Sequence, residues 1–259
     1  MVYSMTLVSL EIVLLNIMST TIAFLINILI VLAILYIEKD LLIKIFGIIV
    51  NTKQKVVKKY KENRRINFDS NNKKRLRNTD FSIICSNCIA GVIYHNLGLQ
   101  FKTPTINLYF EAKDFVKFCS DLKGYLSMEL EEVKTNSNYP VARLGDIKLY
   151  GVHYKNYIEM KNKWNERKKR INYNNLFFIM TERDGCTYDD IVSFSKINYP
   201  HKIIFTHKKY EEIPDSVFIK GTNNKDNYHK TRPLTDYKSK LSSFRFIDDF
   251  DYVEWLNNK

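Results

Sequence analysis

LFFIMTERD, residues 176–184, joins five consecutive apolar residues to four polar ones. A short apolar run that is rich in aromatic and branched side chains and is bounded by polar residues predicts a strand buried on both faces. Buried strands of this kind are typical of a mostly parallel sheet with helices on both faces. Three more runs of this type follow the same pattern: FSIIC (81–85), KIIFT (202–206) and SVFIK (216–220).

The segments between these runs predict the rest of an α/β domain. Apolar residues at helical spacing indicate helices, and a glycine between two alternating stretches indicates a hairpin. The fold class expected is therefore α/β, with a mostly parallel sheet and flanking helices. The additional elements are helices at 89–97, 112–125 and 155–171, a strand at 103–110 (TPTINLYF), and a hairpin around Gly145-Asp146 within 142–154.

Residues 12–37 predict one transmembrane helix ahead of this domain. The run has 26 residues without a charge and consists mainly of Ile, Leu, Val, Ala and Phe. As a helix it is roughly 39 Å long, which exceeds the hydrocarbon core of about 30 Å. A cleavable signal peptide begins with basic residues and has a shorter apolar core, so an anchor is favoured; a buried core helix is the other alternative.

The basic residues that follow this run predict its orientation. Between Glu38 and Asp80 there are 13 Lys or Arg and 5 Asp or Glu, and no basic residue precedes Lys39 in this sequence. The positive-inside rule predicts a single-pass protein of the cell membrane with its soluble domain in the cytoplasm. The basic cluster also favours anionic lipids as membrane partners. From Phe81 onward the excess is small, 27 basic against 22 acidic residues, so no nucleic-acid partner is expected.

Composition divides the chain into three parts. Residues 1–50 form the transmembrane anchor and an interfacial helix, residues 51–80 a basic juxtamembrane linker, and residues 81–259 the cytoplasmic α/β domain. Residues 66–79 are polar, charged and rich in Asn, which is typical of a linker. The four cysteines suggest no disulfide framework and favour a reducing compartment.

Polar residues follow the apolar runs at four places. In open α/β sheets, ligands bind beyond the carboxyl ends of the strands, so these residues are expected to meet around one cavity. The candidate catalytic residues are Cys88, His95, His153, Asp184 and His207, and the candidate substrate-binding residues are Ser86, Asn87, Arg183 and Lys208.

Five stretches resemble a known family in sequence and in order. They are FSIICSNCIAGVIYHNLGLQFKTPTINLYF, YPVARLGDIKLYGVHYKN, FFIMTERDGCTYDDI, KIIFTHKKY and FDYVEWL. From about Phe81 to Leu256 the chain resembles the bacterial domain-of-unknown-function 1919 family, whose members are commonly labelled exopolysaccharide or capsule biosynthesis proteins. The resemblance implies a two-part α/β fold, a role in making surface polysaccharide, and a polysaccharide or lipid-linked sugar as substrate. Family members usually carry Ser-Asn-Asn-Cys-Trp-Gly-Gly where this chain has CSNCIAG at 85–91.

The same motif is distantly similar to the Asn-Cys motif of a capsule acetyltransferase family that binds coenzyme A. This similarity makes acetyl-coenzyme A the candidate donor and polysaccharide O-acetylation the candidate reaction. Cys88 precedes a predicted helix, whose positive end favours the thiolate, and one of the three candidate histidines would act as base with Asp184 or Asp146 orienting it. Transfer would run through a base-activated hydroxyl or an acyl-cysteine.

Other readings stay open. Cys88 fits equally a small residue at a tight turn, and the basic helix at 155–171 fits either a pyrophosphate-bearing ligand or a solvated surface. Cys85 and Cys88 give a weak redox motif, and no ligand set for a metal is apparent. Besides an O-acyltransferase, a glycosyltransferase-like enzyme and a non-catalytic assembly factor of the polysaccharide machinery are candidates, so the sequence leaves enzymatic activity undecided.

Overall fold

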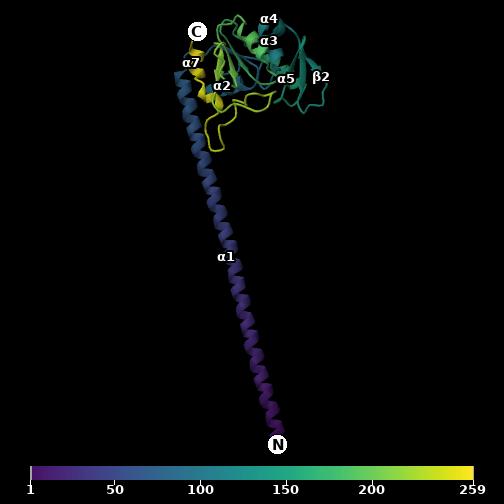
Figure 1. The fold of residues 1–259 in the computed structure, drawn as a ribbon, viewed down its shortest axis with the longest axis vertical. Helices are drawn as coiled ribbons and strands as arrows, with labels where there is room; N and C mark the ends of the chain where they lie inside the picture. Colours follow the sequence, from purple (N-terminus) through teal and green to yellow (C-terminus); the bar gives the residue numbers. More distant parts are fainter. Residues whose placement is uncertain (1, 259) are drawn as a thin grey trace. The chain divides into compact units, whose positions relative to one another are not determined.

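A computed structural model describes the backbone of residues 2–258 and the side chains of residues 18–39 and 41–258. The chain divides after Tyr60 into two compact units. Helix α1 (Val2–Arg75) accounts for the described part of the first unit and also begins the second (Figure 1).

The described side chains of the first unit are mostly apolar and point outward. Phe24 and Leu29, for example, are 66% and 64% exposed. From Met18 onward the helix is long and apolar enough to cross a membrane, and none of its apolar stretch is buried inside the protein. The predicted span begins earlier, at Ile12, but the side chains of residues 12–17 lie outside the described ones.

The second unit is built on a four-stranded parallel sheet. The register places Ile83 opposite Phe177 and Ile179 opposite Ile203. The four apolar runs therefore form the predicted sheet, although the last strand ends before the expected Lys220. In spatial order the strands are β1 (Ser82–Cys85), β5 (Leu176–Thr181), β6 (Lys202–Thr206) and β7 (Ser216–Phe218).

Both faces of this sheet are buried, because successive side chains of a strand point to opposite faces. Ile84 and Phe178 belong to one apolar core, and Ile83 and Phe177 belong to the other. This two-sided burial is the reason why the strands read as continuous apolar runs. The first core is closed by α3 (Ala112–Ser120), α4 (Leu122–Ser127), α5 (Tyr157–Lys168) and α6 (Tyr188–Ser195), and the second by α2 (Ile89–Leu97) and α7 (Tyr252–Asn257).

A second, antiparallel sheet packs into the first core. It consists of β2 (Glu131–Val133), β3 (Val141–Leu144) and β4 (Ile147–Tyr150), in that order. The β3–β4 turn contains Gly145 with a φ of 62°, a left-handed conformation that glycine adopts without strain. The predicted hairpin is confirmed, and the domain has the mixed α/β fold expected from the sequence.

The strand predicted at residues 103–110 is wrong. This segment has no strand, and its backbone bonds go to separate partners: Phe110 N donates to Ser86 O and Tyr109 N to Tyr150 O, each at 3.0 Å. Asn107 has a φ of 65°, which interrupts any extended run. The apolar residues that suggested a strand are buried in the two cores instead.

The polar stretch at 66–79, predicted to be a linker, is helical as far as Arg75, because α1 continues through most of it. The Phe68 ring contacts the Phe244 ring edge-on at 5.3 Å between centroids. The Asn72 amide donates a hydrogen bond of 3.1 Å to the Tyr252 hydroxyl in a buried position. These contacts with the C-terminal part of the chain stabilise a helix that the polar composition alone does not favour.

Replacing Phe177 by alanine is expected to destabilise the second unit by about 3–5 kcal/mol, because a fully buried aromatic ring leaves a cavity. The ring is 0% exposed and contacts Phe81 and Trp255. Urea unfolding of the full chain in detergent micelles, followed by tryptophan fluorescence, measures this, since the chain has 2 tryptophans, Trp164 and Trp255, and both lie in this unit.

The control is Ile158→Ala, at a side chain that is 69% exposed. It should change the unfolding free energy by less than about 0.5 kcal/mol. Equal effects of the two substitutions would contradict the described packing of the sheet.

Candidate functional site

The turn after β1 is held by Asn87. Its amide nitrogen donates to the Thr181 hydroxyl at 2.8 Å, and its carbonyl oxygen accepts from the Ile89 backbone N–H at 3.2 Å. The first bond ties the end of β1 to the end of β5, and the second satisfies a free N–H group at the start of α2. Asn87 therefore fixes the position of Cys88, which directly precedes α2.

A cavity of about 300 Å³, here the first cavity, adjoins this turn. Five residues that the sequence predicts to surround one cavity are among those that line it. The prediction that these five meet is confirmed, and the prediction that His207 joins them is wrong. The lining residues are Asn87, Cys88, Ile89, Tyr109, His153, Arg183, Asp184 and Pro233–Asp236.

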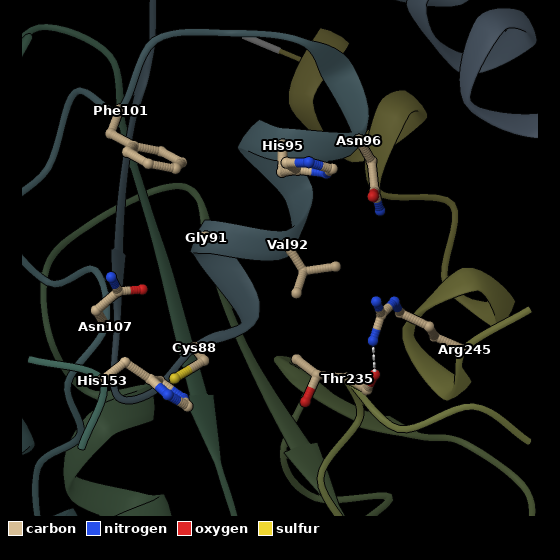
Figure 2. A pocket seen from close by; sticks show the side chains of 10 residues that line it. All are labelled: Cys88, Gly91, Val92, His95, Asn96, Phe101, Asn107, His153, Thr235 and Arg245. Carbon is tan, nitrogen blue, oxygen red and sulfur yellow. Dashed lines mark hydrogen bonds between the residues drawn. The ribbon is translucent and has the colours of Figure 1, made fainter. Parts of the chain in front are cut away.

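A second cavity of about 480 Å³ shares Cys88, His153 and Thr235 with the first. Figure 2 shows its side chains grouped around α2, with the Cys88 thiol and the His153 imidazole at one end and Arg245 at the other. His153 is exposed and lines both cavities. His95, also exposed, projects from α2 into the second cavity only.

The surroundings of the Cys88 thiol oppose its ionisation. Burial, together with the negative charge of Asp184, raises its pKa to about 11. The sequence predicts a thiolate favoured by the start of α2, and the structure places the thiol where its protonated form is favoured. Cys85, on the sheet side, is fully buried and its pKa is raised to about 12, mainly by burial.

Asp184 is buried and has a φ of 57°, a conformation that side-chain-bearing residues adopt rarely. Its Oδ1 lies 3.3 Å from Nδ1 of His229. Burial raises the pKa of the Asp184 carboxyl group, although Arg183 and His229 oppose the rise. The sequence predicts that Asp184 orients a catalytic histidine. In the structure the histidine next to the Asp184 carboxylate is His229. Asp146, the other expected acid, is bound instead to Lys117 at 2.6 Å.

His207 contacts a buried carboxylate behind the cavity wall. Glu182 is 0% exposed, and its Oε2 lies 2.6 Å from Nδ1 of His207 and accepts from the His207 backbone N–H at 3.0 Å. Its Oε1 accepts from the Tyr210 hydroxyl at 3.0 Å and from Lys230 Nζ at 3.3 Å. Burial alone would raise the pKa of this carboxyl group, but the bonds from His207 and Tyr210 lower it below its usual value. His207 is therefore bound to Glu182. Glu182 was not among the site residues predicted from the sequence.

The two remaining candidates lie away from the cavities. Ser86 is buried, its backbone joins the sheet end, and its hydroxyl has no hydrogen-bond partner among the described residues. Lys208 is exposed, and its ammonium group lies 4.9 Å from the centre of the Tyr210 ring. Neither residue lines the first or the second cavity.

Comparison with known proteins gives the family. Residues 59–257 match the model of a domain of unknown function, DUF1919. The chain is a member of the DUF1919 family. Over 208 residues it is also 32% identical to a Haemophilus influenzae (strain Rd) protein described as an uncharacterized protein, a match that covers 80% of this chain and 99% of that relative. The resemblance seen in the sequence is confirmed, and the DUF1919 region begins earlier than expected, inside α1.

The DUF1919 site contains residues that no sequence pattern indicated. Thr235 and Arg245 come from a segment with few regular elements, where neither helical nor strand periodicity exists to guide assignment. Tyr109 was assigned to a strand that does not form. His229 was not among the predicted site residues, and its approach to Asp184 depends on the path of the segment after β7.

Basic residues of the helix predicted at 155–171 have acidic partners. Lys163 of α5 and Arg170, which follows its end, both pair with Glu166. Lys163 and Glu166 also line a cavity of about 490 Å³ along this helix, so ligand binding and a solvated surface both stay predictions for it. Among the described residues, no three His, Cys, Asp or Glu side chains gather as metal ligands do.

Glu182→Gln is expected to cost about 1–3 kcal/mol of unfolding free energy at neutral pH, because it removes a buried charge that accepts four hydrogen bonds. The lowered pKa of Glu182 means that its charged form stabilises the folded state above the usual carboxyl pKa, and that this contribution is lost as the pH falls through the lowered value. Urea unfolding at neutral and acidic pH should show a smaller acid-dependent loss in the variant than in the wild type.

Glu132→Gln, at an exposed position of β2, is the matched control and should retain the wild-type pH dependence. Identical pH dependence of wild type and Glu182→Gln would contradict a stabilising role for the buried carboxylate.

Proposed function

We propose that the protein is a membrane-anchored transferase of exopolysaccharide or capsular polysaccharide biosynthesis, and that it transfers an acyl group from a coenzyme A thioester to a sugar hydroxyl. The observation that carries the proposal is the grouping of His153, Cys88, Arg183 and Asp184 around one cavity at the carboxyl ends of β1 and β5. Open α/β sheets bind their ligands at this edge.

His153 is the best-placed base among the three predicted histidines. Its imidazole is exposed and lines both cavities, so an acceptor in one and a donor in the other can both reach it. Histidine is the side chain most often used for proton transfer near neutral pH. His95 reaches only the second cavity, and His207 is bound to Glu182.

The reaction proceeds in one transfer step. His153 takes the proton of the sugar hydroxyl, the hydroxyl oxygen attacks the thioester carbonyl carbon, and the carbon–sulfur bond breaks. The departing sulfur of coenzyme A receives the proton from the imidazolium. The Arg183 guanidinium, at the same cavity, provides positive charge for the carbonyl oxygen as it becomes negative.

The state of Cys88 favours this direct route over an acyl-cysteine. A thiol must be ionised to act as a nucleophile, and burial raises the pKa of Cys88 to about 11. Its position between the two cavities instead suits a small packing residue beside the reacting groups. Tyr109 adds an aromatic wall to the first cavity, and its ring is held by stacking on Tyr150 with 4.6 Å between centroids. A rigid aromatic surface among a few polar groups suits a sugar ring.

His153→Ala is expected to lower acyl transfer at least about 100-fold, the usual contribution of a general base, whereas Cys88→Ser should retain activity within about threefold. The measurement is the acyl content of surface polysaccharide from cells that lack the native gene and produce each variant. His95→Ala is the matched control and should lose less than about tenfold, since proton transfer is left intact.

Full acyl content with His153→Ala would refute its role as base. Loss of activity in Cys88→Ser equal to that in His153→Ala would favour the acyl-cysteine route instead. Loss of the polymer itself on deletion of the gene, rather than loss of its acyl groups alone, would point to an assembly factor or a glycosyltransferase.

We also propose that the chain is a single-pass protein of the cell membrane with the DUF1919 domain in the cytoplasm. Support comes from the apolar helix and from the basic residues that follow it in the sequence. This arrangement holds the domain at the bilayer, where lipid-linked sugars are located, and the basic residues favour anionic lipid head groups.

Alkaline carbonate should leave the protein in the membrane fraction, because an apolar span resists extraction. Trypsin added to intact spheroplasts should leave the domain uncut, and trypsin added to inverted vesicles should cut it. Release of the protein by carbonate would exclude a spanning anchor. Cleavage of the domain in intact spheroplasts would show that the domain faces the outside of the cell, contrary to the proposal.

A further inference from the structure

A third cavity of about 360 Å³ extends the site beyond Arg245. It shares Thr235 and Arg245 with the second cavity, and Thr235 and Asp236 with the first. The three cavities therefore adjoin along the segment from Thr235 to Arg245. All of their lining residues belong to the second unit, which begins at Lys61.

The third cavity is positively charged. Lys61, Lys240 and Arg245 line it, and Asp236 is the one acidic residue among its described lining residues. Two acids follow Arg245 closely in the sequence, and neither lines this cavity. Asp248 Oδ2 lies 2.6 Å from the Arg65 guanidinium and also accepts from the Arg245 backbone N–H at 2.6 Å, and Asp249 is bound to Lys238.

The cations are held in place by the protein. The Arg245 guanidinium donates to the carbonyl of Thr235 and lies over the Tyr237 ring at 4.5 Å, so one of its five N–H groups is used there. Lys61 donates to the backbone carbonyl of Lys240 at 2.7 Å, which leaves two ammonium donors. Figure 2 shows the Arg245 side chain reaching into the space that it shares with α2.

We propose that this basic end binds the pyrophosphate of the substrate whose reacting end lies at His153. The assignment rests on the proposed transferase function and names the chemistry that the donor or acceptor must carry. Planar guanidinium and ammonium groups converging on one cavity match phosphate oxygens in charge and in donor number. Coenzyme A, nucleoside diphosphates and polyprenyl diphosphates share this group, so the site recognises the pyrophosphate and the remaining cavities select what is attached to it.

Calorimetric titration of the full chain in uncharged detergent micelles with inorganic pyrophosphate tests the assignment. Arg245→Gln should weaken binding at least about tenfold, because a charge-assisted donor pair is lost. Lys240→Met, at an exposed side chain that is not needed for folding, should weaken it about threefold. Lys134→Met is the matched control, since Lys134 is exposed and lines none of the three cavities, and it should bind as the wild type does.

Parallel titrations with coenzyme A, uridine diphosphate and farnesyl diphosphate identify the source of the group. If both variants weaken pyrophosphate binding, the basic site is supported. If uridine diphosphate displaces the bound pyrophosphate and coenzyme A does not, the acyl-transfer proposal is removed while the basic site stands. Coenzyme A binding that Arg245→Gln and Lys240→Met leave unchanged would overturn the basic site while acyl transfer stands. Absence of pyrophosphate binding at millimolar concentration would also overturn it.

Discussion

The buried carboxylate of Glu182 is the interaction on which the arrangement of the site depends. It lies just beyond β5, one of the two inner strands of the parallel sheet, and it is closed off from water. Its partners are His207 after β6 and Lys230 in the segment after β7, while its backbone oxygen accepts from Thr231 at 3.2 Å. Loss of a donor to the carboxylate would leave a buried charge less well paired, which destabilises the folded state. Three segments that are distant in sequence are thereby fixed at one edge of the sheet.

The cavities are built between these segments. The β1 and β5 ends contribute Cys88 and Asp184 through tight turns, and the segment after β7 forms the opposite wall with Thr235. That segment has backbone hydrogen bonds within itself, such as the one from Asn224 N to Lys230 O at 2.8 Å. It is also bonded to the sheet end, including by the bond from Gly185 N to Tyr228 O at 3.0 Å. The two sides of this cavity are thus supplied by different parts of the chain.

The sequence predicted the parts of this structure that depend on local pattern. Because β1, β5 and β6 are buried on both faces, they are recognisable in the sequence as apolar runs. The polar residues that follow these runs led to the correct prediction that Cys88 and Asp184 lie at one cavity. Prediction failed where distant contacts decide the outcome. The helix at residues 66–75 is stabilised by side chains near the C-terminus, and Arg245 reaches the cavity only because of the path of an irregular segment. His207 has the right position in the sequence but a buried acid, Glu182, binds it.

The distribution of cysteines gives this protein a practical property. Three of its four thiols are sealed inside the apolar cores, and Cys88 alone is half-buried, at the junction of two cavities. A thiol-reactive fluorophore applied to the native chain at alkaline pH therefore has one accessible attachment point. Emission from that label would register occupancy of the neighbouring space by any small molecule, so candidate ligands can be screened without first removing other cysteines.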